Sequence, residues 1–392
     1  MNSRERFVAA IRNQVPDRVP VAPDISNYVP AKSTGLPFWD IYFFNQVPLW
    51  RAYLAMVDQF GFDAWNASSY GVGGTPVNPD YTEKVSYDYR SGDNAMVKTT
   101  VWHTPDGDLT GKSLCFRGDP PSPVEKPIRD IVRDFPKYRH LIAGEMKFDF
   151  TEAFAVRAEY EKREMAFGLN IGYPGFHNFA GVLAGGLTDL VYAEADTPEI
   201  LEEWAEIIHH QCIAQLQATL STIPVDYMLL GGSGTLTLSS PEMVRKYALP
   251  TLREMTRLCR EAGVPTMLHS CGKSLALLEI LAEETELDCI NPLEIPPMGD
   301  VILADVKARY GKRLALMGNL HTTNVMLKGS AAEVTAAARR AMADAGAGGG
   351  FILSTGDQCG PETPDENLFA IVEAAKQFGV YDAAGQLPQC GA

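Results

Sequence analysis

The chain has 392 residues, with 34 Lys or Arg and 49 Asp or Glu, and a formal net charge of −15 at pH 7. This acidity excludes the usual nucleic-acid-binding proteins, whose affinity depends on Lys and Arg at phosphates. No apolar run reaches the roughly 18 residues that span a bilayer, and the N-terminus lacks the apolar core of a secretory signal. Seven irregularly spaced cysteines favour a reducing compartment over a disulfide framework. We therefore expect a cytoplasmic protein with no membrane or nucleic-acid partner.

Short apolar runs alternate with amphipathic helical stretches along most of the chain. The predicted strands are 19–25, 62–66, 165–173, 226–233, 266–271, 288–294, 314–320 and 350–357. The predicted helices are 48–60, 198–222, 241–262, 275–284, 301–310, 331–345 and 364–378. Because parallel strands need helix-length crossovers, eight such units predict a (β/α)8 TIM barrel of the α/β class. An open doubly wound sheet is the alternative, but no GxGxxG fingerprint follows the first strand.

Residues 67–150 interrupt this alternation with a segment rich in Gly, Pro and Thr. Within it, residues 99–103 and the turn at 105–107 predict a β-hairpin. We interpret 67–150 as a β-rich insertion after strand two, lying over the barrel mouth. The whole chain, 1–392, is then expected to be a single barrel domain.

The strongest chemical signal is His269-Ser270-Cys271-Gly272, at the end of the fifth predicted strand. Residues i and i+2 of a strand face the same side, so the imidazole and the thiol should face one point. Cys359, just past the eighth predicted strand, could join them, because all strands of a barrel end on one face. Three ligands with an open fourth position are typical of catalytic zinc.

Spacing alone leaves two interpretations open, because a chance HxC match is common and buried cysteines are usually inert packing. Cys289 is a rival third ligand, which we interpret as core because Leu287 and Ile290 flank it. Carboxylates near predicted strand ends are Asp24, Glu294, Asp357 and Glu362. The candidate substrate-binding residues are Tyr28, Asn27, His177 and Tyr70.

Several of these segments together resemble the uroporphyrinogen decarboxylase superfamily. They are SRER at 3–6, PDRVP at 16–20, SPEMVRKYALP at 240–250, GD at 299–300, LMGNL at 316–320 and GPETPDEN at 360–367. The resemblance spans most of the chain outside 67–150. It implies a (β/α)8 barrel with its site at the carboxyl ends of the strands.

The superfamily has two main branches, which differ in their motifs. Porphyrin decarboxylases carry an arginine-rich motif, MRQAGR, soon after the first strand, whereas the stretch here, APDISNYVP at 22–30, has no arginine. Zinc-dependent methyltransferases that exchange methyl groups with corrinoid proteins carry HxCG and a late cysteine, which are present as 269–272 and Cys359. The resemblance therefore implies zinc held by His269, Cys271 and Cys359. Glu294 or Asp24 would complete coordination or orient the substrate.

The function expected from this resemblance is zinc-dependent methyl transfer between a small methylated substrate and a corrinoid protein. The substrate would be a methyl ether, alcohol or amine, and the chain would be the O-demethylase-type component. Two alternatives stay open: a cofactor-free decarboxylase, and a non-catalytic binding protein on a catalytic fold. Homodimerisation is also left open by the sequence.

Overall fold

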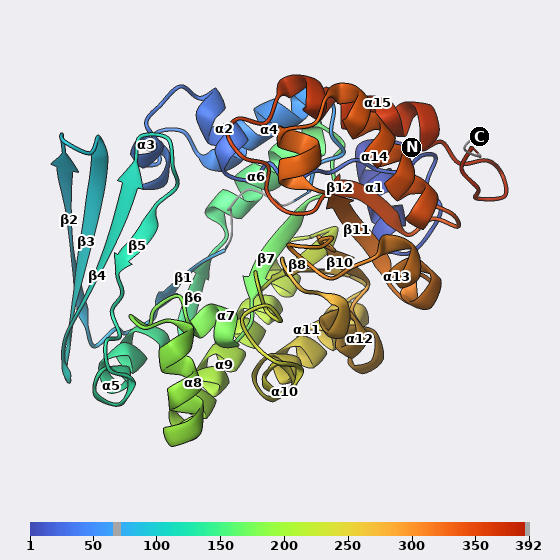
Figure 1. The fold of residues 1–392 in the computed structure, drawn as a ribbon. Coiled ribbons are helices and arrows are strands. Elements are labelled where there is room, and N and C mark those ends of the chain that lie inside the picture. The colour runs from blue at the N-terminus through green and yellow to red at the C-terminus, as the bar shows by residue number, and fades with distance from the viewer. Residues whose placement is uncertain (66–71, 389–392) are drawn as a thin grey trace.

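The computed structural model of the protein describes residues 1–65 and 72–388. Its central feature there is a six-stranded parallel sheet in the order β12-β11-β10-β9-β8-β7 (Figure 1). The strands are β7 Gly168–Gly172, β8 Tyr227–Gly231, β9 Thr266–His269, β10 Cys289–Asn291, β11 Ala315–Leu320 and β12 Phe351–Thr355. The last six predicted strands are thus confirmed, each somewhat shorter than its expected range.

The prediction of regular strands at 19–25 and 62–66 was wrong for the described residues. Val21 forms only an isolated parallel bridge with Leu353 of β12, and the Asp63 amide donates to the Val21 carbonyl at 2.7 Å. Pro20 and Pro23 have no N–H to donate to a ladder. Ala64 has a φ of +44°, which breaks the extended conformation.

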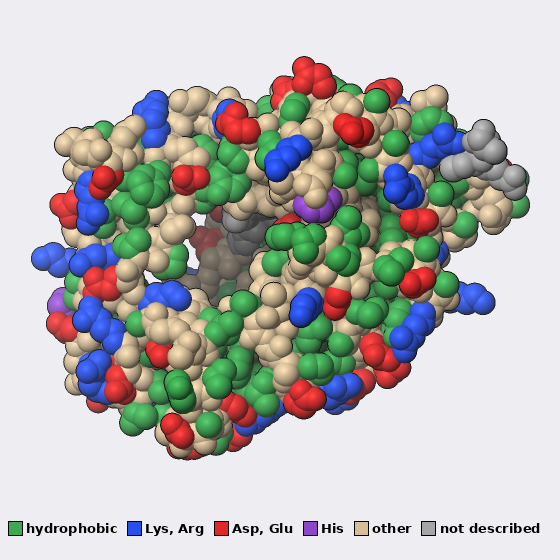
Figure 2. Space-filling model, in the orientation of Figure 1, with side chains coloured by type: hydrophobic (Ala, Val, Ile, Leu, Met, Phe, Trp, Pro, Cys, Tyr) green, Lys and Arg blue, Asp and Glu red, His purple; other side chains and the backbone are tan. Residues whose placement is uncertain are grey.

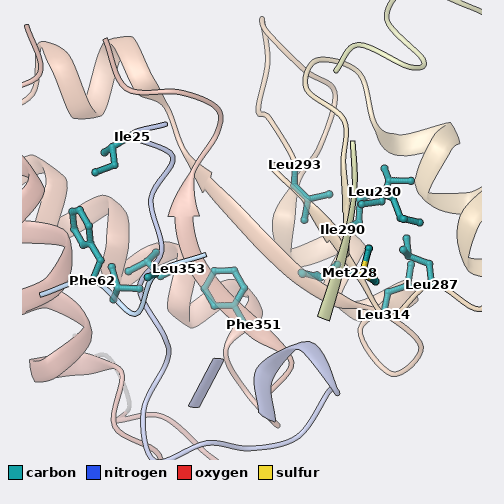
Figure 3. Packing of buried hydrophobic residues seen from close by; sticks show 14 of the residues in the cluster. Ile25, Phe62, Met228, Leu230, Leu287, Ile290, Leu293, Leu314, Phe351 and Leu353 are labelled. Atoms are coloured by element: carbon teal, nitrogen blue, oxygen red, sulfur yellow. The ribbon is translucent and has the colours of Figure 1, made fainter. Parts of the chain in front are cut away.

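Side chains on the parallel strands separate into two buried layers, as alternation along a strand requires. One layer joins Tyr227, Met267, Cys289 and Ile352 to Ala22, Trp65 and Ala166, with Phe7, Ala10 and Ile11 of α1 packed among them. The other packs against the surrounding helices, and Figure 3 shows Leu353 near Ile25 and Phe62 in this layer. All eight predicted strand positions thus contribute to one inner cluster, although no ladder between 62–65 and β7 is present in the described residues.

Most predicted helices are confirmed. They are α4 Leu49–Phe60, α9 Pro198–Thr222, α12 Leu275–Glu284, α13 Leu303–Tyr310, α14 Ala331–Ala345 and α15 Asp365–Phe378. The structure adds α1 Ser3–Ile11, α2 Tyr28–Ser33, α3 Phe38–Tyr42, α5 Ile131–Ile142, α6 Thr151–Lys162, α7 Phe176–Phe179, α8 Leu187–Asp196 and the π-helix η2 Thr322–Leu327. Of the described helices, none is both long and apolar enough to cross a membrane.

The continuous helix predicted over 241–262 was wrong in detail. A short α10, Pro241–Met243, passes into the π-helical turn η1, Val244–Ala248, and then into α11, Leu249–Glu261. Pro250 lacks the N–H that a regular helix needs at this point, and the wider π turn absorbs that interruption.

The segment after the second predicted strand forms an antiparallel sheet beside the parallel one (Figure 1). Its strands run in the order β2-β3-β4-β5, with bounds β2 Thr82–Arg90, β3 Ala95–Thr104, β4 Gly107–Phe116 and β5 Ser122–Glu125. The predicted hairpin is confirmed as β3–β4, paired from Ala95 with Phe116 to Thr104 with Gly107. A second pair joins β1 Gly73–Pro76 to β6 Met146–Asp149. Figure 2 shows the visible face hollowed between this antiparallel sheet and the rest of the molecule.

A histidine clamp ties the β3–β4 turn to α5. His140 Nδ1 lies 2.7 Å from Asp80 Oδ2, and Nε2 lies 2.8 Å from Asp106 Oδ2 in the turn. The hydrogen bond to Asp106 is the largest effect on the pKa of His140, and together with Asp80 it raises that pKa. An imidazolium can donate to both carboxylates at once, which a neutral ring cannot.

We expect this clamp to make stability depend on pH. Because the folded-state pKa of His140 is raised, its contribution is fully present below the unfolded value of about 6.5 and is lost as pH rises through the folded pKa. The substitution His140→Gln should flatten the pH dependence of the urea midpoint above about pH 6.5. His103→Gln on β3, where the imidazole is 49% exposed beside Asp108, is the matched control. Equal pH profiles for the two variants would contradict the assignment.

Candidate functional site

The HxCG segment closes the carboxyl end of β9. Ser270 is buried, and its N–H donates to the Asn291 carbonyl at 2.9 Å, whereas His269 and Cys271 on either side are partly exposed. Gly272 has a φ of +81°, and a Cβ there would lie 2.0 Å from Thr237 Oγ1. The glycine is therefore required by both backbone conformation and space. The alternating exposure is what the i, i+2 argument predicts for His269 and Cys271.

Asn291, at the end of β10, sets the tautomer of His269. Its Nδ2 lies 3.4 Å from the Met317 sulfur and 3.6 Å from the Met267 sulfur, which are weak acceptors, so its Oδ1 is the atom that faces the imidazole. Oδ1 lies 2.9 Å from His269 Nδ1 and can only accept, so Nδ1 carries the proton. In the neutral tautomer with this proton, Nε2 keeps its lone pair, as a metal-ligating histidine requires.

Cys271 lies among some groups that raise the pKa of its thiol and others that lower it. Burial raises its pKa to about 11, and the charges of Asp357 and Glu294 add to the increase. Ser233 and the Gly234 amide, in the loop after β8, act in the other direction by hydrogen bonding to the sulfur. The loop after β8 thus supplies hydrogen-bond donors beside Cys271.

Cys359 and Asp24 come together from opposite ends of the chain. The Cys359 amide donates to the Asp24 carbonyl at 2.8 Å, and the Asp24 amide donates to Thr355 Oγ1 at 2.9 Å. Cys359 is fully buried, and burial, followed by the charge of Asp24, raises its pKa to about 12. Burial also raises the pKa of Asp24, while the nearby His269 acts to lower it. Asp24 is thus the group in electrostatic contact with both His269 and Cys359.

Two further carboxylates lie near Cys271. Glu294 is 6% exposed, and its Oε2 accepts the Gly272 N–H. Burial raises the pKa of Glu294, and the charge of Asp357 raises it further. Asp357 itself has a φ of +150°, a conformation that non-glycine residues rarely adopt and that tends to occur at functional sites. Sequence analysis noted Asp357 as a strand-end carboxylate without giving it a role.

Shared carboxylates link the proposed ligands. Asp24 interacts electrostatically with His269, and its charge also acts on Cys359. The charge of Asp357 acts on both Cys271 and Cys359, and that of Glu294 acts on Cys271. Within residues 1–65 and 72–388, no three His, Cys, Asp or Glu side chains already form a metal-binding group. The meeting of His269, Cys271 and Cys359 at one ion stays a prediction, while the free Nε2 and the two thiols are a donor set that suits zinc.

His177 occupies a partly buried position near the Cys271 side of the site. Burial lowers its pKa to about 4, and its Nδ1 is buried with no partner among the described residues. Its ring centroid lies 4.8 Å from that of Tyr173, whose hydroxyl is 2.7 Å from Thr235 Oγ1. The Thr235 amide in turn donates to Ser270 Oγ at 3.2 Å. A neutral imidazole with an unused nitrogen is suited to a substrate contact.

The other candidate substrate-binding residues lie beside the Cys359 loop or outside the described part. Asn27 Oδ1 accepts the Tyr42 hydroxyl at 3.0 Å, and the Tyr28 ring packs 6.4 Å from that of Phe38. Ser26, next to Asn27, accepts the Gln358 amide. Tyr70 lies outside the residues that the structure describes.

The interpretation of Cys289 as a core residue is confirmed. It is buried in an apolar cluster, as are Cys212 and Cys259, and burial raises the pKa of each thiol. Asn291 was missed by sequence analysis. Its signal was a polar side chain ending an otherwise apolar strand that runs beside β9.

The chain is similar to known proteins in both its fold and part of its sequence. A solved methyltransferase from Methanosarcina mazei covers 96% of this chain and 99% of its own, with a TM-score of 0.66 and 18% identity, which shows a shared α/β fold. The family model described as Uroporphyrinogen decarboxylase (URO-D) matches residues 184–378. This segment, which includes β8 to β12, is similar to the uroporphyrinogen decarboxylase family, in agreement with the resemblance seen in the sequence.

Curated relatives from both branches are also similar to this chain. The Methylcobamide:CoM methyltransferase MtbA of Methanosarcina mazei is 27% identical over 197 residues, which are 48% of this chain and 52% of the relative. The Uroporphyrinogen decarboxylase of Thioalkalivibrio sulfidiphilus is 31% identical over 180 residues, 45% of this chain and 47% of the relative. The chain thus spans about half the length of the curated relatives it matches.

Proposed function

We propose that this protein is a zinc-dependent methyltransferase that moves a methyl group between a small molecule and a corrinoid protein. The observation that carries the proposal is the His269–Asn291 contact, which leaves Nε2 free beside the segment that bears Cys271. The similarity to MtbA, whose name specifies methylcobamide, supports the corrinoid partner. The absence of an arginine motif near residue 24 argues against a porphyrin carboxylate as substrate.

His269, Cys271 and Cys359 would hold the metal, with Asp24 or Glu294 available as a further ligand. Bound zinc would supply a Lewis acid that stabilises negative charge on the departing atom of the methyl donor. Asn291 fixes the imidazole that binds it, and Ser233 with the Gly234 amide favours the thiolate form of Cys271. His177 would orient the substrate. A corrinoid must approach the methyl group closely for the transfer to occur.

Two directions of transfer are consistent with this donor set. The finer proposal is the demethylating direction, in which a methyl ether, alcohol or amine gives its methyl group to the corrinoid. The opposite direction, in which a thiol accepts the methyl group, is the second candidate because MtbA is named a methylcobamide:CoM methyltransferase. The 31% identical decarboxylase keeps a cofactor-free decarboxylase as the alternative reaction class.

The test is an anaerobic assay of the purified, zinc-analysed chain. Cob(I)alamin is mixed with methanol, anisole or trimethylamine, and conversion to methylcobalamin is followed in the visible spectrum. Methylcobalamin is separately mixed with coenzyme M. We expect turnover in the first assay and about one zinc per chain. Turnover only with the thiol would reverse the direction, and inactivity of zinc-loaded protein in both assays would overturn methyl transfer.

A further inference from the structure

β2 is an edge strand whose outer side has no partner among the described residues. It lies at the end of the order β2-β3-β4-β5, and all nine of its residues are exposed. Figure 1 shows it at the outer margin of the molecule, away from the parallel sheet. An edge of this length presents a row of free N–H and C=O groups to any strand that can align with it.

The charges on β2 are arranged symmetrically about its centre. The sequence is TEKVSYDYR, with Lys84 and Asp88 each two residues from Ser86. Within their own sheet, Lys84 lies opposite Val101 and Asp88 opposite Val97. Neither charged side chain has an ion pair or hydrogen bond in the part of the chain that the structure describes. The opposite charges are therefore available to a partner.

Antiparallel geometry restricts how two copies of β2 can pair. Directly opposite residues project to the same face, so the two-fold axis must lie midway between the two copies of a single residue. Pairing about Ser86 places all nine residues opposite one another and sets Lys84 against Asp88 of the second copy, twice. Pairing about Tyr87 would set Lys84 against Arg90, which is repulsive. Pairing about Val85 would leave Lys84 opposite a serine.

The same register also pairs apolar side chains. It sets Val85, which is 37% exposed, opposite Tyr87 of the second copy, which is 39% exposed. A β-branched and aromatic cross-strand pair is among the favourable ones. Both members lie on the face of β2 whose Tyr87 ring already packs 4.9 Å from Phe44. The pairing would therefore extend an apolar layer that one chain begins.

We propose that the outer edge of β2 is a homodimer interface, in which two copies pair antiparallel about Ser86 into one eight-stranded sheet. Backbone hydrogen bonds would supply the affinity, and the two Lys84–Asp88 pairs would select the register. Charges on an edge also oppose pairing in other registers, which limits the contact to two copies. This inference is independent of the proposed reaction.

Charge reversal with rescue tests the interface on the full chain. Sedimentation equilibrium over a range of concentrations should give a mass twice the 42.9 kDa of one chain. The single variants Lys84→Asp and Asp88→Lys each create two like-charge contacts and should raise the dimer dissociation constant about tenfold or more. The double variant restores two opposite-charge pairs and should return it close to the original value. Lys147→Asp, at an exposed position of β6, is the control for the charge change.

Three results would overturn the interface. One is a wild-type chain that stays monomeric at every concentration. Another is a dimer that both single variants leave unchanged. The last is a double variant that is as weak as the single ones, because that result would place Lys84 and Asp88 away from each other. Circular dichroism of each variant checks that the fold is retained.

Discussion

Replacing Cys271 by alanine is expected to lower bound zinc from about one ion per chain to near none, and methyl transfer by about 100-fold or more, because even outer-shell changes at metal sites cost 10- to 100-fold. The substitution removes one of the three proposed protein ligands. Catalytic zinc sites use three protein ligands, so the two that remain should not retain the ion. Cys359→Ala should have the same effect, although that thiol is fully buried and the charge of Asp24 acts on it. Metal content after dialysis is measured beside the transfer rate.

Cys259→Ala provides the matched control for these two variants. Cys259 is also a fully buried thiol, but it lies on α11 in the main apolar core. It should keep its zinc and a rate within a few-fold of the original. Zinc retained by Cys359→Ala but lost from Cys271→Ala would remove Cys359 from the ligand set. Full zinc in both variants would contradict the proposed centre.

The helices were the most predictable part of the fold because their signals are local. α9, α12 and α14 begin and end at the predicted residues. α14 starts with a capping box, in which Ser330 and Glu333 satisfy each other's backbone N–H groups, and that pattern is visible in the sequence. The π-helical turn at 244–248 was not predictable, because it depends on how the chain accommodates Pro250 within a helix that the apolar pattern continues.

The candidate site also has a part that the sequence could predict and a part that it could not. Strand-end positions placed His269, Cys271 and Cys359 on one face of a barrel, since that argument needs only the order of elements. The contacts that tune them are not local. Asn291 lies 22 residues from His269 in the chain, and no spacing rule joins the two. Nor does the sequence show that the loop after β8 faces the Cys271 sulfur, because that depends on how the two strand ends are aligned.

A buried carboxylate joins the first two predicted strand segments to the fold in place of a strand ladder. Asp63 is fully buried and accepts Arg6 Nη1 at 2.6 Å and Arg18 Nη1 at 2.8 Å. Its Oδ2 also accepts the Val21 amide at 2.9 Å, and Ser3 Oγ donates to Oδ1 at 3.0 Å. One carboxylate thus joins α1 to both extended segments. The sequence does not show that the charged residues at 17–18 and 63 contact one another. The apolar residues beside them therefore predicted ordinary strands there.

Removing this carboxylate should have the largest effect on stability of the substitutions considered. Asp63→Ala leaves the guanidinium of Arg6, 8% exposed, with only Asp17 as a charged partner. Breaking a buried ion pair by removing one member costs about 3–5 kcal/mol, and the remaining Asp17 contact places the expected loss near the lower value. The free energy of unfolding is measured from urea transitions at neutral pH.

Asp58→Ala is the matched comparison for that prediction. Asp58 pairs with Arg163 at 3.0 Å, but its side chain is 47% exposed, and exposed pairs contribute about 0–1 kcal/mol. Asp63→Asn should fall between the two, because the amide oxygen still accepts the Val21 N–H while the charge is lost. If Asp63→Ala unfolds at the same urea concentration as Asp58→Ala, then the inner apolar cluster around Ala22 and Trp65 holds the first two segments. In that case the ion pairs of Asp63 with Arg6 and Arg18 would contribute little to the free energy of unfolding.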